Sequence, residues 1–446
     1  MQLRRSRARG LPLLTAALGL SVVGLGVPVH AAGLAPAQAR QPGPTRIMLA
    51  GDSITHGRAG DYTYRYWLWR GVRSVGADVD FVGPRQDLAY AKTSYLDPAF
   101  DRDHAAMAGS TTAYHLDRIT EEVATHRPAV VVIMIGFNDL RVRTPEATAA
   151  NIRTYVERVR AVDPAVDLVV GQVTTGWSAS GGAMLQAETH TLNVLLHGLA
   201  AVLDTPESRV DLALIADGWD PAAHTWDGIH PTPTGQTRLA QRVADSLVRI
   251  DAVSARPLID KAVAWPATYV VGGRALDRRI DLTWDATGID AWTSRVRHHL
   301  VAPVRGAATT TGWSTGSQRA IPGLRAGGTY ELQVQPRRGT MTGAWSRPVR
   351  VRASGRVPVV SRTTATWRAR RLRVRWQQAA TSDTYTVAYR TRRHGRPWNA
   401  WRHTARSGGA ATLAVSRRTA RAQVRITPRN DYLTGSPVTH RAVRPR

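Results

Sequence analysis

Four short stretches of the sequence carry groups suited to nucleophilic catalysis by a serine. Ser53 follows the apolar run IMLA, and Asp227 and His230 lie three residues apart in HTWDGIHPTPTGQ. At that spacing a carboxylate can accept a hydrogen bond from the imidazole Nδ1–H while Nε2 faces the serine. Gly109, in HAAMAGSTTAYHL, and Asn138, in MIGFNDL, could donate hydrogen bonds to an oxyanion. Taken singly, each of these residues is also typical of an ordinary turn or helix entrance.

The elements that must position these residues alternate between two hydrophobic periods. Between residues 45 and 251, amphipathic stretches separate five apolar runs, RIMLAG, DVDFVG, AVVVIMIG, DLVVGQV and RVDLALI. This alternation predicts an α/β fold with a mostly parallel sheet, and AVVVIMIG has the composition of a central strand covered on both faces. The final helix is predicted over about Pro233–Arg249. Ser53 should lie at the carboxyl end of a strand, where open α/β sheets place their sites.

In this order, GDSITHG, Gly109, GFND and DGIH resemble the four blocks of the SGNH, or GDSL-type, hydrolases. The resemblance covers residues 45–252 and implies a three-layer sandwich. It implies that Ser53 is the nucleophile, His230 the general base and Asp227 the carboxylate that orients it. The oxyanion hole would comprise the N–H groups of Ser53 and Gly109 and the side-chain amide of Asn138. The resemblance implies neither metal nor other cofactor, and the sequence shows no cluster of metal ligands.

Within this family, GDSIT followed by YTYRYWLWRGV and VDFVG is most similar to the acetylxylan-esterase-type carbohydrate esterases. The resemblance therefore implies a serine esterase that acts on acetyl or other short acyl esters, with an acetylated polysaccharide as the expected substrate. Phe137 stands where a small threonine is usual, and we expect its ring to narrow the acyl side of the pocket. The second block lacks the extra glycine often found before Gly109. Two alternatives stay open: a lipase or lysophospholipase of the same family, and a non-catalytic protein that binds the cell wall.

The N-terminus has the features of an export signal. Four arginines in MQLRRSRARG precede the apolar run LPLLTAALGLSVVGLGVP, and small-residue cleavage motifs follow. This pattern predicts a signal peptide over residues 1–39, secretion, and no transmembrane span after cleavage. The chain contains no cysteine, so its folded parts must be stable without disulfides.

After residue 260 the helical period gives way to short alternating strands, which predicts an all-β class. Arg279 and Trp284 recur as Arg371 and Trp376, at the same offset in sequence, which predicts two tandem domains over residues 260–355 and 356–446. The first, with Trp284, Leu324 and Tyr330, resembles a fibronectin type III domain. The second resembles it less closely, because Ala422 replaces the corner tyrosine.

The C-terminal half is strongly basic. Residues 41–260 contain 20 basic and 26 acidic residues, whereas residues 261–446 contain 35 basic and 7 acidic ones. Tryptophans among arginines, as in RPWNAWR, could bind an anionic polysaccharide or cell-wall polymer, although a basic spacer that only improves solubility is an equal alternative. Nucleic acid is a less favoured partner, since no recognition motif is present. The pentapeptide GWSTG, residues 312–316, matches a nucleophile-elbow pattern, but we interpret it as a strand connection because no helix follows.

Overall fold

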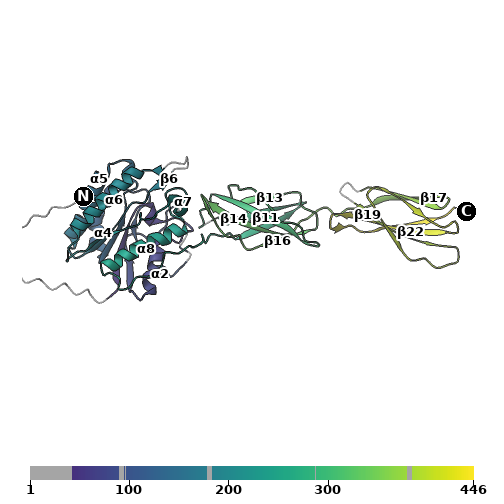
Figure 1. Cartoon of the computed structure of the whole chain (residues 1–446). Helices are drawn as coiled ribbons and strands as arrows, with labels where there is room; N and C mark the ends of the chain where they lie inside the picture. The colour runs from purple at the N-terminus through teal and green to yellow at the C-terminus, as the bar shows by residue number, and fades with distance from the viewer. Residues whose placement is uncertain are drawn as a thin grey trace, which may run out of the picture. The chain divides into compact units, whose positions relative to one another are not determined.

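Residues 43–252 fold around a parallel β-sheet that helices cover on both faces in this computed structural model (Figure 1). The structure describes residues 43–89, 95, 97–177, 183–286, 288–378 and 384–445, so the predicted signal peptide lies outside the described residues. In sheet order the strands are β2 (Val79–Val82), β1 (Thr45–Gly51), β4 (Val130–Met134), β5 (Asp167–Gly171) and β8 (Val210–Ala213), with β3 (Ala105–Ala106) beside the end of β1.

Alternate residues of β1 belong to the two hydrophobic cores. Ile47 and Leu49 pack in the core shared with α2 and α8, whereas Met48 and Ala50 pack in the core shared with α4, α5 and α6, because strand side chains alternate between faces. The helical segments are α1 (Ser53–His56), α2 (Tyr64–Ser74), α3 (Thr112–Leu116), α4 (Ile119–His126), the 3-10 turn η1 (Asp139–Arg141), α5 (Pro145–Val162), α6 (Gln186–Leu203), α7 (Pro221–His224) and α8 (Pro233–Arg249). Two short strands, β6 (Gly176–Trp177) and β7 (Ala183–Met184), pair with each other.

Local sequence accounts for two predicted elements in particular. β4 is buried along its whole length, as its uniformly apolar sequence predicts. The predicted final helix is confirmed as α8, where the Thr232 side chain accepts a hydrogen bond from Gly235 N and Pro233 occupies the first turn. In the described part of the chain, no helix is both long and apolar enough to cross a membrane.

The first all-β region contains two antiparallel sheets that enclose one core. One sheet has the order β13-β10-β9, and the other has the order β12-β11-β14-β15, with β16 also pairing with β14. The core contains Trp284 and Leu324, and the hydroxyl of Tyr330 accepts a hydrogen bond from Arg325 N at 2.9 Å, as in a tyrosine corner. The strand bounds are β9 (Val271–Leu276), β10 (Arg279–Trp284), β11 (Thr293–Ala302), β12 (Thr309–Thr310), β13 (Gln318–Ile321), β14 (Thr329–Arg338), β15 (Met341–Thr342) and β16 (Val349–Arg352).

The second all-β region repeats this arrangement. Its sheets have the orders β17-β18-β21 and β20-β19-β22-β23, with β24 also pairing with β22, around a core that contains Trp376. Arg337 pairs with Thr342 in the first region, and Arg429 pairs with Thr434 in the second, so the repeat is kept in the register. The strands are β17 (Ser361–Arg368), β18 (Arg371–Gln377), β19 (Thr384–Arg392), β20 (Arg402–Arg406), β21 (Ala410–Ala414), β22 (Arg421–Asn430), β23 (Leu433–Thr434) and β24 (Val438–Val443).

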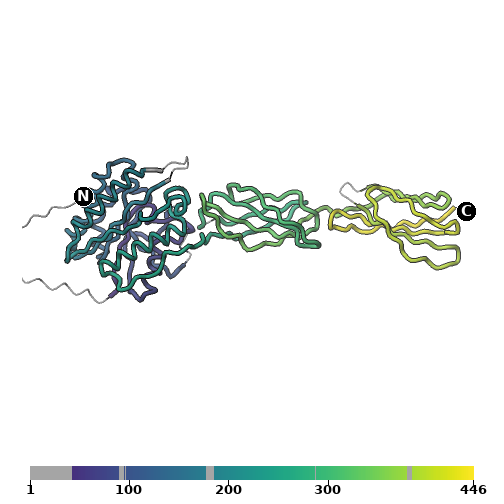
Figure 2. The backbone as a smooth tube through the Cα atoms, in the orientation of Figure 1, coloured from purple at the N-terminus to yellow at the C-terminus, as the bar shows by residue number. Residues whose placement is uncertain are grey.

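The three folded regions are consecutive along the chain, as the colour of the backbone tube shows (Figure 2). The predicted α/β class of the first and all-β class of the other two are confirmed. Contacts between Cα atoms join residues 43–446 into one compact unit. The GWSTG segment contains no nucleophile elbow, because Ser314 forms an antiparallel bridge with Ser294 and the strand β13 follows.

Candidate active site

Ser53, His230 and Asp227 form a continuous hydrogen-bonded chain. Ser53 is the first residue of α1, directly after β1, and its Oγ lies 2.9 Å from His230 Nε2. His230 lies in the loop between α7 and α8, and its Nδ1 is 2.7 Å from Asp227 Oδ2. With the ring proton on Nδ1, that atom donates to the carboxylate and Nε2 can accept the serine hydroxyl proton.

The loop that carries His230 fixes the Asp227 carboxylate with its own backbone. Asp227 Oδ1 accepts hydrogen bonds from Ile229 N at 3.0 Å and from His230 N at 2.8 Å. Burial of the carboxyl favours its neutral form, but hydrogen bonds from His230 and Ile229 outweigh this effect and hold the pKa of Asp227 below its ordinary value. The carboxylate is therefore charged where an imidazolium would need a counter-ion.

The turn before Ser53 packs tightly against the sheet. Gly51 has φ +154°, and a Cβ there would overlap the carbonyl oxygen of Met134, so the neighbouring strand requires glycine. Asp52 caps α1 by accepting a hydrogen bond from Ile54 N at 2.9 Å, and burial raises its pKa to about 6. Because Ser53 is the first residue of the helix, its N–H has no partner within the helix and can serve an oxyanion.

Gly109 and Asn138 belong to loops that meet beside this turn. Gly109 has φ +78°, and the hydroxyl of the next residue, Ser110, donates to Gly51 O at 3.4 Å. Asn138 Nδ2 donates to Ser110 O at 3.0 Å. Since a primary amide carries two hydrogens, the second is available for an oxyanion. The structure thus brings all five predicted residues into one connected region.

Asp139 is a supporting residue that the sequence reasoning missed. It is fully buried, and its carboxylate accepts hydrogen bonds from Thr112 N at 3.0 Å and Thr112 Oγ1 at 2.6 Å. These bonds tie the segment containing Asn138 to the start of α3, which follows Gly109. The sequence signal for this role was the position of Asp139 at the end of GFND, directly after an apolar strand, because a carboxylate buried there needs hydrogen-bond donors.

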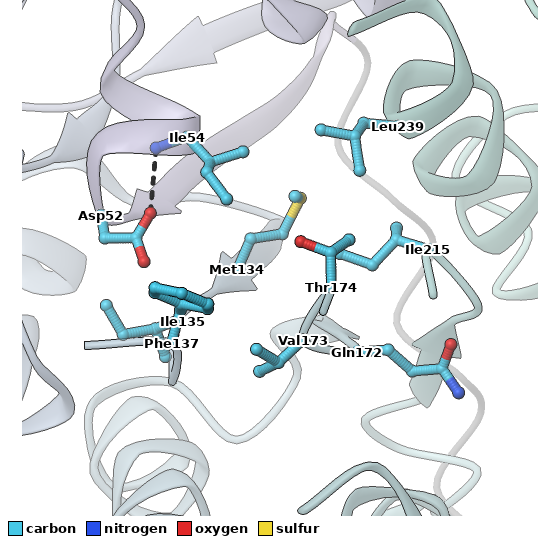
Figure 3. A pocket seen from close by; sticks show the side chains of 10 residues that line it. All are labelled: Asp52, Ile54, Met134, Ile135, Phe137, Gln172, Val173, Thr174, Ile215 and Leu239. Carbon is cyan, nitrogen blue, oxygen red and sulfur yellow. Dashed lines mark hydrogen bonds between the residues drawn. The ribbon is translucent and has the colours of Figure 1, made fainter. Parts of the chain in front are cut away.

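A small, mainly apolar pocket lies beside the turn at residues 51–54, which carries the predicted nucleophile and is called the nucleophile turn below (Figure 3). Asp52 and Ile54, the two neighbours of Ser53, contribute to it, and so does Phe137, the neighbour of Asn138. Phe137 is buried, and a Cβ on Gly176 would lie only 3.1 Å from its ring, so the ring fills this space. The remaining lining residues are Met134, Ile135, Gln172, Val173, Thr174, Ile215 and Leu239.

Three residues far apart in sequence form a cluster that the sequence did not reveal: ligand atoms of His56, Asp87 and His104 lie within 4.8 Å of one another. This group corrects the expectation that no such cluster exists, but its hydrogen bonds do not suit a metal. Nδ1 of His56 and Nδ1 of His104 each accept a backbone N–H at 3.1 Å, and burial lowers both histidine pKa values. Each neutral ring therefore carries its proton on Nε2, the atom that faces Asp87.

Trp226 is a second residue near the site that the sequence reasoning missed. Its ring stacks on His230, with 5.5 Å between the ring centroids and 20° between the planes. Its backbone N donates to His230 O at 2.9 Å, and the side chain is 2% exposed. Trp226 thus packs against the loop that carries His230 through its ring and its backbone.

Residues 49–238 of the α/β domain match the GDSL-like Lipase/Acylhydrolase family. A curated relative is the multidomain esterase of Ruminococcus flavefaciens, 25% identical over 223 residues, which are 46% of this chain and 29% of the relative. The chain thus spans less than a third of the length of that relative.

Solved structures that match part of the chain include carbohydrate esterases. A family 3 carbohydrate esterase from Talaromyces cellulolyticus is 25% identical with a TM-score of 0.41, over 46% of this chain and 97% of that one. A family 3 carbohydrate esterase from Clostridium thermocellum is 23% identical with a TM-score of 0.39, over 46% and 96%. A segment of two fibronectin type III domains from chicken tenascin is 16% identical with a TM-score of 0.28, over 40% and 99%.

Proposed function

We propose that this protein is a secreted serine esterase that removes acetyl or other short acyl groups from a polysaccharide. The hydrogen-bonded chain from Ser53 through His230 to Asp227 carries the proposal. The curated relative described above is named an esterase, which supports the reaction class. A solved structure that is also 25% identical to this chain is a carbohydrate esterase, which agrees with the substrate class. Export, predicted from residues 1–39, would bring the enzyme to such polymers.

The reaction follows from the positions of these atoms. Ser53 Oγ attacks the ester carbonyl carbon while its proton passes to His230 Nε2, and Asp227 stabilises the resulting imidazolium. The carbonyl oxygen becomes an oxyanion, to which the N–H groups of Ser53 and Gly109 and the amide of Asn138 donate. When the tetrahedral adduct collapses, the bond to the sugar oxygen breaks and Nε2 returns the proton to it. Water then releases the acid from the acyl-enzyme by the same sequence.

We infer that the pocket beside the nucleophile turn receives the acyl group and that its small size favours a short one. Phe137 fills space beside the nucleophile turn, and the lining described above leaves a small apolar hollow. We expect turnover of 4-nitrophenyl esters to fall from acetyl towards palmitoyl. Preference for chains of about eight or more carbons would instead identify a lipase or lysophospholipase of the same family.

The nucleophile is tested by Ser53→Ala in the mature protein. Loss of Oγ removes the attacking atom, so kcat for 4-nitrophenyl acetate should fall to near background. The decrease can reach about a millionfold, and the background hydrolysis of the assay sets how much of it is measured. The melting temperature should hardly change, because the side chain is small and only partly buried. Full activity in the variant would reject the assignment, and an inert wild-type protein would favour a non-catalytic binding protein.

We further propose that the second all-β region binds an anionic wall polymer. Arg371, Arg373 and Arg375 alternate with buried residues on β18, so their exposed side chains form one row, about 7 Å apart. The residues that pair with this row on β17 and β21 include no acid: they are Arg368, Thr366, Thr364, Ala414, Thr412 and Ala410. A linear polyanion fits such a row, and its binding should weaken with salt.

This binding is tested in the full chain by changing all three arginines to glutamine. Co-sedimentation with polygalacturonate should weaken by about tenfold or more at low ionic strength, because three adjacent charges are lost. The matched control changes three arginines that are exposed outside the strands, Arg393, Arg417 and Arg418, to glutamine. Both variants therefore have the same net charge. Equal loss in both variants would indicate a non-specific charge effect, and unchanged binding in the first would reject the row as a site.

A further inference from the structure

We infer that the first all-β region is a structural part of the active site: the turn at Arg338–Thr340 holds Trp226, and Trp226 holds His230. Arg338 is thus a positioning residue for catalysis, although it lies 108 residues beyond the histidine in sequence. The inference rests on the proposed esterase function. It replaces the interpretation of this region as a spacer.

Trp226 contacts the loop that carries His230 through both its ring and its backbone. Trp226 directly precedes Asp227, and its ring lies almost parallel to the His230 ring. The backbone of Trp226 also donates a hydrogen bond to His230 O. Because both ends of the DGIH segment contact Trp226, a displacement of this tryptophan would move the imidazole relative to Ser53 Oγ.

The turn at Arg338–Thr340 holds Trp226 in place. Thr340 N donates to Trp226 O at 3.0 Å, and the Arg338 guanidinium lies 4.7 Å from the centroid of the Trp226 ring. Between them, Gly339 has φ +52°, and a Cβ on it would overlap the carbonyl oxygen of Trp226. All three residues lie at the turn between β14 and β15. The turn therefore contacts Trp226 closely through both its backbone and its only long side chain.

The same arginine, Arg338, also reaches the loop that follows Ser53. Arg338 is fully buried, and it donates to Ala59 O at 3.0 Å and to the carboxylate of Asp61. Arg58 in that loop also pairs with Asp290, which precedes β11. A buried guanidinium needs such partners. The first all-β region thus contacts both the segment that follows Ser53 and the segment that carries His230.

The inference is tested by Gly339→Ala in the full chain. An added methyl group must push the turn away from Trp226 without changing any charge. We expect kcat for 4-nitrophenyl acetate to fall by about tenfold or more, with KM changed by less than about twofold, because the imidazole is misplaced and not the substrate pocket. The acid limb of the profile of kcat/KM against pH should also shift, since the contact between His230 and Asp227 changes.

The matched control is Gly323→Ala in the same region. Gly323 has φ +72°, so alanine is strained there too, but a Cβ would meet no atom within 4 Å. Titration of active sites with a serine-directed phosphonate counts the folded, competent molecules, and kcat is expressed per titrated site. Mere loss of folded protein would lower the number of sites and would leave the kcat per site and the pH profile unchanged.

A second pair of variants covers the case in which Gly339→Ala does not fold. Arg338→Lys keeps the charge but loses the planar group that reaches Ala59 O and Asp61 together, and it should reproduce the loss of kcat. Arg337→Lys is its control, because Arg337 stacks on Trp313 instead. Equal kcat and pH profiles in Arg338→Lys and Arg337→Lys, or in the two glycine variants, would overturn the inference. Inactivity of the wild type would instead reject the proposed function.

Discussion

Partly buried carboxylates in the α/β domain differ in the donors that reach them. Asp227 receives hydrogen bonds from the ring and backbone of His230, which hold its pKa down despite burial. Glu122, on α4, has the opposite behaviour, because burial raises its pKa to about 7. Its Oε2 has no hydrogen-bond partner among the described residues. The carboxylate of the proposed catalytic triad is thus supplied with donors, whereas the partial burial of Glu122 has a cost in free energy.

The cost at Glu122 gives a prediction about stability and pH. Because its pKa is higher in the folded state, the neutral acid favours folding below about pH 4.5, and this contribution is lost as the pH rises through about 7. Glu122→Gln should therefore raise the free energy of unfolding by about 1–2 kcal/mol at pH 8 and hardly change it at pH 5. This magnitude allows for the partial exposure of the side chain, which reduces the effect of burial. Urea denaturation at both values tests this, with the exposed Glu121→Gln as control. A Glu122→Gln effect that is equal at both pH values would contradict it.

At the scale of elements, one turn serves the same purpose in both all-β regions. Asp431, at the turn between β22 and β23, has φ +49°, as Gly339 has φ +52° at the equivalent turn of the first region. Its carboxylate accepts a hydrogen bond from Ala326 N at 2.8 Å and pairs with Arg278. Each region therefore uses this turn to contact the region that precedes it in the chain.

The sequence predicted those elements whose cause is local. The uniformly apolar β4 and the capped α8 were predicted correctly, because composition and end signals determine them. The offset between Trp284 and Trp376 revealed the repeat. The support of Trp226 by Arg338 was missed, because it depends on which loop the turn meets in space. The cluster of His56, Asp87 and His104 was missed for the same reason.

At the scale of the whole molecule, we expect the two all-β regions to have separable roles. The first contacts Trp226 and Asp61, beside the proposed catalytic residues, through Arg338. The second carries the exposed arginine row of β18, and its described contacts with the preceding region include those of Asp431 and Tyr432 with residues near Ala326. Removal of the second region should therefore affect capture of a polymer and leave the chemistry of a small ester unchanged.

Two truncations separate these roles. A protein that ends after residue 355 keeps the turn against Trp226, so its kcat for 4-nitrophenyl acetate should stay within about twofold of that of the full chain. A protein that ends after Asp260 exposes Trp226 and Asp61, and its kcat should be lower by about tenfold or more. Acetate release from an acetylated xylan that bears uronic acids should fall in both at low salt. In the protein that ends after residue 355, this decrease in acetate release should disappear at high salt, because screening removes the advantage that the basic region gives the full chain. Circular dichroism establishes that each truncated protein is folded. Full activity in a folded protein ending at Asp260 would show that the α/β domain positions His230 unaided, and the first all-β region would then be a spacer after all.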